Sequence, residues 1–301
     1  MKAERINRMA VGIEEGIEYI DRKRQQIDIL LDKYLPSEEI YPYALHKAMR
    51  YSVLAGGKRI RPILTMTAYE SFGGIDETVI NPAACALEFI HTYSLIHDDL
   101  PCMDDDDLRR GMPTLHKKFD EATAVLAGDA LHDLAFGLVA QSGSAPAVKE
   151  MADAIGTFGM LGGQMADVEA EGKNVNLDQI KYIHTHKTGA LIRASVRIGA
   201  ILAGVDDARL ATLSRYGEKI GFAFQIIDDI LDIEGDQKKL GKEVGSDCKN
   251  NKATYPGTAG MEQAHRDADR LIDEAIAISM ELGSKGTHFG SIARYIGQRE
   301  S

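Results

Sequence analysis

The sequence predicts an all-α fold, and two observations about its patterning support this. Nearly every segment repeats its apolar residues at the helical period, and no hairpin dipeptide stands between two alternating, strand-like runs. The composition, with 44% hydrophobic and 27% charged residues, is that of an ordinary soluble globular protein. A chain of 301 residues can form one large domain or two, and it is long enough for a substantial core.

Charge and cysteine content narrow the function classes. The net charge of −11 argues against general nucleic-acid binding, which needs a basic surface, but it leaves room for small anionic substrates. The segment Met1–Arg24 lacks the continuous apolar core of a secretory signal, and no uncharged apolar stretch reaches about 18 residues, so we expect no membrane-spanning helix. Three unpatterned cysteines, Cys85, Cys102 and Cys248, are typical of a reducing cytoplasm.

The first two predicted helices lead into a basic loop. Residues Glu14–Tyr34 carry an apolar stripe that ends before Pro36, and Pro42–Leu54 forms the second helix. In the loop Ala55–Pro62, two glycines allow close backbone approach to a ligand, and Lys58, Arg59 and Arg61 suit charge-assisted phosphate binding. A basic loop that caps the end of a helix remains the alternative.

A third helix is predicted to begin at Asn81, as the capping residue, with Pro82 in its first turn, and to run to about Asp98. On this helix His91, Ser94 and Asp98 share one face, because they are separated by offsets of three and four residues. A lone histidine on a helix is usually a core residue, but the alignment with Asp98 favours a functional role.

The aspartate-rich stretch Ser94–Gly111 is the strongest chemical signal in the chain. It contains six aspartates followed by Arg109 and Arg110. Carboxylates this close repel one another unless cations lie among them, and hard oxygen ligands suit Mg²⁺, Mn²⁺ or Ca²⁺. Pro101 breaks the helix, so Asp104 would reach the site over a bulge. A metal bridged to a diphosphate is the functional interpretation, and a solvated acidic loop is the alternative.

The middle of the chain continues in helices. A helix is predicted near Phe119–Ala140, and Ser142–Pro146 forms a turn. Lys187 and Thr188 are predicted to lie at the beginning of a helix, where they suit either an anion or a cap. The pair in Val205–Asp207 is interpreted as the N-cap of a helix over Ala208–Phe224, since it has no third carboxylate one turn on.

A second acidic cluster lies in Phe224–Asp232. Asp228 and Asp232 are four residues apart and therefore share a helical face, with Gln225 a turn earlier on nearly the same face. Unpaired charges inside this apolar run would be costly, which favours a functional role. Lys242 and Lys252 follow in the sequence, and Met261–Gln298 is predicted to be helical.

Taken together, these motifs resemble the short-chain trans-isoprenyl diphosphate synthases. Both aspartate-rich segments match, as do Gly56-Gly-Lys-Arg59, Gly163-Gln164 with Asp167, Lys187-Thr-Gly189 and Lys252 with Thr254-Tyr-Pro256. The resemblance spans almost the whole chain. It implies a single domain over residues 1–301, a helical bundle around a deep central cavity, a homodimer, and head-to-tail prenyl transfer.

The resemblance also assigns roles by position. Asp98, Asp104 and Asp228 would hold about three Mg²⁺ ions, with Mn²⁺ as a possible substitute. The residues implied for the allylic diphosphate are Arg109, Lys187, Thr188, Gln225, Lys242 and Lys252, and those for isopentenyl diphosphate are Lys58, Arg61, His91 and Arg110. The catalytic set is Asp98, Asp104, Arg109, Lys187, Asp228 and Lys242.

Product length is implied by the residues before the first aspartate pair. An aromatic at Tyr93 with a small residue at Ser94 resembles the bacterial farnesyl type and implies a C15 product. The alternatives are a geranyl or geranylgeranyl diphosphate synthase of the same fold, or, from another class, a non-catalytic partner subunit of a longer-chain synthase. A terpene cyclase is disfavoured because the residue set for a second diphosphate is intact.

Overall fold

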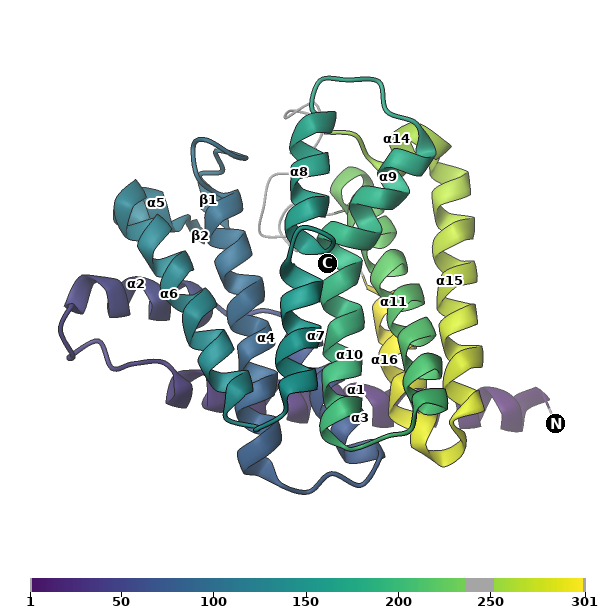
Figure 1. Ribbon diagram of the computed structural model, residues 1–301. Coiled ribbons are helices and arrows are strands. Elements are labelled where there is room, and N and C mark those ends of the chain that lie inside the picture. Colours follow the sequence, from purple (N-terminus) through teal and green to yellow (C-terminus); the bar gives the residue numbers. More distant parts are fainter. Residues whose placement is uncertain (1, 236–251, 300–301) are drawn as a thin grey trace.

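The computed structural model describes residues 2–235 and 252–299, with side chains described from residue 14. Its described part is all-α except for one short hairpin, as the sequence predicts (Figure 1). The helices are α1 (Lys2–Tyr34), α2 (Tyr43–Val53), α3 (Ile60–Ser71), α4 (Glu77–Asp98), α5 (Leu115–Lys118), α6 (Glu121–Ala140), α7 (Ala145–Ile155), α8 (Met160–Ala170), α9 (Leu177–Ile183), α10 (Ala190–Leu202), α11 (Asp207–Glu234), α14 (Tyr255–Ala259), α15 (Met261–Glu281) and α16 (Thr287–Gly297). A π-helical turn, η1 (His184–Gly189), joins α9 to α10, and a 3-10 turn, η2 (Gly283–Gly286), precedes α16.

The long helices run side by side and α1 crosses beneath them (Figure 1). Helix α4 packs against α3 and α6, α10 packs against α3 and α11, and α11 packs against α15. Their facing apolar stripes form one core, in which Phe89 of α4, Tyr216 of α11 and Phe289 of α16 are fully buried. The carboxyl-terminal ends of α4 and α11 lie at the same end of the bundle, together with α8 and α14 (Figure 1).

Helix α4 begins five residues earlier than the sequence predicts. Asp76, not Asn81, is the N-cap, and its carboxylate accepts a hydrogen bond from the backbone N–H of Thr78 at 2.9 Å. Pro82 therefore lies inside the helix, where it removes one backbone bond to the carbonyl of Thr78. The buried apolar run that starts at Ile80 outweighs this loss, since each buried aliphatic side chain contributes about 1.5–3 kcal/mol.

A two-stranded hairpin, β1 (Leu108–Arg109) and β2 (Met112–Pro113), follows the aspartates. Its turn is Arg110-Gly111, and both residues have positive φ angles of 54° and 75°. Two left-handed residues in a two-residue loop match the twist of antiparallel strands. The sequence missed this hairpin because its strands are too short to show alternation and because arginine is an unusual residue at a left-handed position.

Two other boundaries test the sequence predictions. The N-cap role of Val205–Asp207 is confirmed, because Asp206 accepts a hydrogen bond from the N–H of Arg209 at 2.8 Å at the start of α11. The helix-start prediction for Lys187 and Thr188 is wrong, because both lie in η1, in the middle of a continuous helical run from α9 to α10. Their backbone N–H groups are therefore not at a helix N-terminus.

By length and hydropathy, one helix in the described ranges, α6, could cross a membrane, and 39% of its apolar window is buried. The criterion of an uncharged stretch excluded it because it contains Asp129 and Asp133. Helix α6 packs along α4, and core helices of globular proteins pass the same test of length and composition. One such helix is weak evidence for a span.

Candidate active site

The first acidic wall forms at the end of α4. The backbone N–H of Asp104 donates to the carbonyl of Asp98 at 2.8 Å, after a turn in which Met103 N–H donates to Leu100 O at 2.9 Å. This turn at Pro101 places Asp104 beside Asp98, as the sequence predicts. Burial raises the pKa of Asp98, Lys187 opposes that rise, and the negative charge of Asp104 adds to it. Asp98 and Asp104 therefore form a region of high negative charge, which cations would stabilise.

Two lysines from distant segments supply cations there. The Nζ of Lys252 lies 2.7 Å from Oδ2 of Asp104, and the Nζ of Lys187 lies 2.6 Å from Oδ2 of Asp167 on α8. Burial opposes the charge on Lys187, but Asp98 and Asp167 raise its pKa above the usual range. Gly163 makes this approach possible, since a Cβ there would lie 2.1 Å from the backbone nitrogen of Lys187.

Five of the six aspartates of this stretch divide into three kinds, and the sixth, Asp106, lies 3.7 Å from Nη2 of Arg109. Asp98 and Asp104 form the acidic wall, while Asp99 is buried and binds Arg109, with Nε at 2.7 Å and Nη2 at 2.5 Å from Oδ1. Burial raises the pKa of Asp99 to about 6, although Arg109 favours its charged form. Asp105 and Asp107 are exposed and contact Lys117, so the solvated-loop interpretation holds for them.

The second acidic wall lies on α11. Asp228 is 36% exposed, and its Oδ1 lies 2.5 Å from Nη2 of Arg299. The Arg299 guanidinium also lies 4.2 Å from the centre of the Phe224 ring, in cation–π contact. Asp232 is buried one turn further along the helix. Sequence reasoning missed Arg299, because a single arginine near the end of a helical segment has no distinguishing pattern.

A hydrogen-bonded chain joins η1 to α11. Thr188 Oγ1 donates to Gln225 Oε1 at 2.7 Å, and Gln225 Nε2 donates to Asp229 Oδ1 at 3.0 Å. The structure thus brings together Thr188 and Gln225, which the sequence predicts to act on the same ligand. Asp229 was not among the predicted site residues.

A cationic cluster surrounds the glycine loop before α3. Arg110 donates to the carbonyl of Gly56. Gly57 has a positive φ of 145°, and a Cβ there would lie 3.0 Å from the Arg110 guanidinium, so this position favours glycine. Burial and the charge of Arg299 lower the pKa of Lys58 to about 8, and burial lowers the pKa of Arg61 to about 10. Neighbouring cations lower one another's pKa values here, and a bound anion would relieve that repulsion, so the cluster is a candidate anion site.

His91 belongs to this cluster and Arg59 does not. Burial, with Arg61 and Arg110 nearby, lowers the pKa of His91 well below 6.5, so its imidazole is neutral at pH 7. Arg59 has a left-handed φ of 54° and turns inward, where it contacts Glu88 at 2.7 Å and Asp28 at 2.9 Å. One of the three cations in this loop therefore anchors the loop instead of facing the cluster.

The residues predicted to set product length lie just below Asp98. Tyr93 is 6% exposed, and its ring lies edge-on to His97 at 5.4 Å and to His132 of α6 at 5.2 Å between centroids. Ser94 donates its hydroxyl hydrogen to the carbonyl of His91 at 2.9 Å. Lys242 and Cys248 lie outside the described residues.

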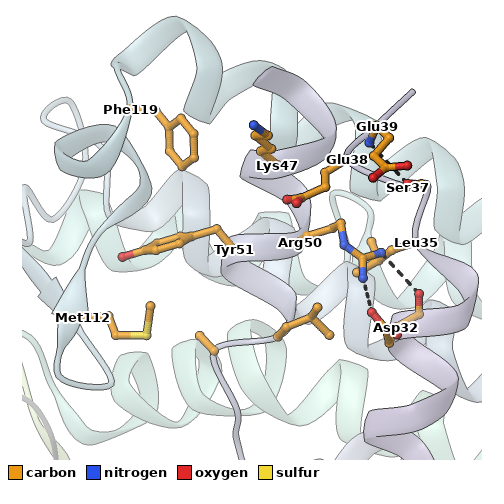
Figure 2. Close-up of a pocket in the computed structure, with 12 residues that line it drawn as sticks. Asp32, Leu35, Ser37, Glu38, Glu39, Lys47, Arg50, Tyr51, Met112 and Phe119 are labelled. Atoms are coloured by element: carbon orange, nitrogen blue, oxygen red, sulfur yellow. Dashed lines mark hydrogen bonds and ion pairs between the residues drawn. The ribbon is translucent and has the colours of Figure 1, made fainter. Parts of the chain in front are cut away.

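The large cavity of about 870 Å³ lies away from these groups, beside the end of α1 and helix α2 (Figure 2). Its lining includes Leu35, Lys47, Arg50, Tyr51 and Phe119, and none of the predicted site residues. A smaller pocket is lined by Asp99, Arg109 and Arg110. Within residues 2–235 and 252–299, no three acidic, histidine or cysteine side chains converge as a ready metal cage.

Comparison with known proteins identifies the family. The family model described as polyprenyl synthetase matches residues 42–285. Farnesyl diphosphate synthase of Escherichia coli is 49% identical over 265 residues, covering 84% of this chain and 88% of that protein. The heterodimeric geranylgeranyl pyrophosphate synthase large subunit 1 of Arabidopsis thaliana is 45% identical over 296 residues, covering 94% and 79%.

A solved structure agrees with the sequence relatives. The geranyltransferase of Helicobacter pylori, complexed with magnesium and isoprenyl diphosphate, has a TM-score of 0.81 and 33% identity, covering 93% of this chain and 96% of that one. The all-α bundle agrees with this structural similarity. The chain therefore belongs to the polyprenyl synthetase family and is a prenyltransferase with the all-α isoprenoid synthase fold.

Proposed function

We propose that this prenyltransferase condenses isopentenyl diphosphate head-to-tail with dimethylallyl and then geranyl diphosphate, giving farnesyl diphosphate. The observation that carries the C15 assignment is the buried ring of Tyr93, backed by His132 on the neighbouring helix. A buried aromatic supported from behind closes the space below Asp98 to a longer chain. The 49% identity to the farnesyl diphosphate synthase of Escherichia coli supports the same product.

The two groups of cations are assigned to the two diphosphates. Arg109, Lys187, Thr188, Gln225 and Lys252 border the acidic walls and bind the allylic diphosphate, and Lys242 is proposed to join them. Lys58, Arg61, His91 and Arg110 form the separate cluster that binds isopentenyl diphosphate. The neutral His91 contributes a hydrogen bond and no charge, since burial keeps its pKa low.

The carboxylates suit a divalent cation. Asp98, Asp104 and Asp228 provide hard oxygen ligands, and Mg²⁺ takes one or two carboxylates while substrate phosphates and water complete its shell, so no three-residue cage is required. We assign Mg²⁺, about three ions by family resemblance, with Mn²⁺ as a substitute. When bound, the metal neutralises charge on the diphosphate as the allylic C–O bond breaks.

The protein's own groups favour the same bond cleavage. Breaking the C–O bond leaves an allylic carbocation and puts negative charge on diphosphate, so the attraction of Lys187, Lys252 and Arg109 grows along the reaction. The double bond of isopentenyl diphosphate attacks this cation, which forms a C–C bond and leaves a new tertiary carbocation. That carbocation loses a proton from C2 to the departing diphosphate, and the new double bond forms. A dry site protects the cation from water.

Product analysis tests the proposal. The purified protein is incubated with Mg²⁺, dimethylallyl diphosphate and isopentenyl diphosphate, and the dephosphorylated alcohols are sized. We expect a dominant C15 alcohol. A dominant C20 or C10 product would favour the geranylgeranyl or geranyl synthase, the former being the activity named for the Arabidopsis thaliana relative. Metal binding without turnover would favour a non-catalytic partner subunit.

We further propose that residues 1–301 form one domain and that the protein acts in the cytoplasm. We also propose that it forms a homodimer through α6. Helix α6 is mostly apolar, yet Val125 is 40% and Leu126 is 58% exposed. A second copy that covers this face would bury the apolar surface. Light scattering measures the mass: Leu126→Glu should give a monomer, while Leu161→Glu, a matched change on the exposed face of α8, should leave the dimer intact.

A further inference from the structure

The two adjacent aspartates of α11 face different surroundings. The side chain of Asp228 is 36% exposed, whereas that of Asp229 is 5% exposed. Successive residues on a helix point about 100° apart, so only one of an adjacent pair faces the site. The other must find its partners inside the protein.

The Asp229 carboxylate is contacted by its own helix and by two segments distant in sequence. Its Oδ1 accepts from Nε2 of Gln225 at 3.0 Å, and its Oδ2 accepts from the backbone N–H of Tyr255 at 2.7 Å. The Nε2 of His184, a ring that is itself 5% exposed, lies 3.3 Å from the same Oδ2. A buried carboxylate held by two hydrogen bonds and a close imidazole is fixed in place.

Each of these segments carries a group that borders the acidic walls. Gln225 accepts from Thr188 at 2.7 Å, so Asp229 sets the orientation of the Gln225 amide and, through it, of Thr188. Tyr255 is three residues from Lys252, which contacts Asp104 of the opposite wall at 2.7 Å. His184 begins the π-helical turn that carries Lys187.

We propose that Asp229 is a positioning residue that holds Thr188, Gln225 and Lys252 in register for the allylic diphosphate, without binding metal or substrate itself. This role rests on the proposed allylic-diphosphate site. A single carboxylate between η1, α11 and the start of α14 fixes three elements that are distant in sequence. Its place beside Asp228 would otherwise suggest a metal ligand, but its burial and its contacts with Gln225, Tyr255 and His184 assign it a positioning role.

The decisive comparison is Asp229→Asn against Asp228→Asn. An asparagine keeps the shape but turns one acceptor into a donor, which opposes either the Tyr255 N–H or the Gln225 amide. We expect Asp229→Asn to raise the KM for geranyl diphosphate by about tenfold or more, the loss expected for a charge-assisted hydrogen bond. The KM for isopentenyl diphosphate should change less than about twofold, because Asp229 contacts none of that cluster.

Binding measurements separate positioning from metal ligation. Mn²⁺ is titrated by electron paramagnetic resonance in the presence of saturating inorganic pyrophosphate. Asp229→Asn should keep the full number of bound ions and lose affinity for pyrophosphate, whereas Asp228→Asn should lose a bound ion. An equal loss of Mn²⁺ in the two variants would overturn the proposal, as would an unchanged pyrophosphate affinity in Asp229→Asn.

A double-mutant cycle excludes a general loss of structure. Because Thr188 is linked to Asp229 through Gln225, the effects of Asp229→Asn and Thr188→Val on pyrophosphate affinity should combine to less than their product. Strictly multiplicative effects would refute the link. If Asp229→Asn does not fold, His184→Leu removes the imidazole that contacts Asp229 and should also lower the affinity for pyrophosphate. An unchanged affinity in that variant would refute the positioning role of Asp229. A wild-type protein without prenyl transfer would instead reject the proposed function, while the pyrophosphate titrations would still report on Asp229.

Discussion

Lys58 gives the sharpest prediction, because its charge should be lost within an accessible pH range. Burial is the largest cause that lowers its pKa to about 8, followed by repulsion from Arg299, and Arg110 adds to it. In the free enzyme the ammonium is therefore half neutral near pH 8, and at pH 9 about one molecule in ten retains it. An uncharged Lys58 cannot attract a diphosphate.

The proposed role of Lys58 makes this visible in kinetics. Above pH 8, kcat/KM for isopentenyl diphosphate should fall about tenfold per pH unit, since this ratio reports the protonation state of the free enzyme. The profile for the allylic substrate should be flatter, because Lys58 is not among its proposed contacts. Both diphosphates are fully ionised above about pH 7.5, so the substrates do not contribute to the slope.

Two variants test the cause. Lys58→Arg keeps its charge at high pH and should extend the plateau beyond about pH 9.5. Arg299→Gln removes the second-largest cause and should move the midpoint upward. A flat wild-type profile between pH 7.5 and 9.5, or the same profile in Lys58→Arg, would refute the reasoning.

The same shift affects stability with a definite sign. The folded state lowers the lysine pKa from 10.5, so it disfavours the charged form, and the cost is present below pH 8 and disappears as pH rises toward 10.5. The full shift corresponds to at most about 3 kcal/mol. Lys58→Met should therefore raise the melting temperature at pH 7 and have little effect at pH 10.5. A stabilisation that is equal at both values would contradict the assignment.

Three further predictions address other parts of the site. Asp98→Asn should lower kcat by about a thousandfold or more, because charge stabilisation in the transition state is lost. Its melting temperature should stay the same or rise, because a buried charge is removed. A near-normal rate would show that Asp98 is not part of the metal site. Tyr93→Ala should lengthen the products seen by chromatography and lower the free energy of unfolding by about 3 kcal/mol. Tyr93→Phe keeps the ring and should keep the C15 product. Unchanged product lengths in the alanine variant would mean that another residue limits the chain. Glu88→Gln should lower the free energy of unfolding, measured by chemical denaturation, by about 3–5 kcal/mol, because it breaks the buried ion pair with Arg59. Asp28→Asn, at the half-exposed carboxylate that also contacts Arg59, should lower it by less than about 1 kcal/mol. Equal losses in the two variants would refute this distinction.

Much of the fold follows from sequence because helical periodicity is a local property. The apolar stripes of α1, α2 and α6 predict these helices to within a few residues, apart from the longer N-terminal part of α1. Helix α11 joins the predicted helix Ala208–Phe224 and the acidic helical segment Phe224–Asp232 into one element. The start of α4 was wrong because two capping signals compete, and burial from Ile80 onward favours the earlier one at Asp76. The hairpin at Arg110 was invisible because two-residue strands carry no period.

The site could be predicted only in part, because many of its contacts join segments that are distant in sequence. Spacing predicts that Asp98 and Asp104 approach each other, because a proline turn separates them. Contacts across the bundle leave no local trace: Arg299 meets Asp228 from 71 positions away, and Lys252 reaches Asp104 from the other half of the chain. Composition likewise counted Arg59 among the phosphate-facing cations, and only tertiary packing shows that it turns toward Glu88.

The π-helical turn η1 has a consequence for how this chain tolerates changes in length. Its wider i→i+5 bonding holds one residue more than an α-helical turn would, so the residues before and after it are out of phase with a plain α-helix. Deleting one residue within His184–Gly189 would let the run from α9 to α10 become a regular α-helix with both halves in register, because the wide turn holds the extra residue. Deleting one residue from the regular part of α10 would instead rotate the rest of that helix by about 100° and carry its buried stripe away from α3. A change of length within the π turn is therefore absorbed locally, at Lys187 and Thr188, whereas the same change in the adjoining α-helix disturbs the core.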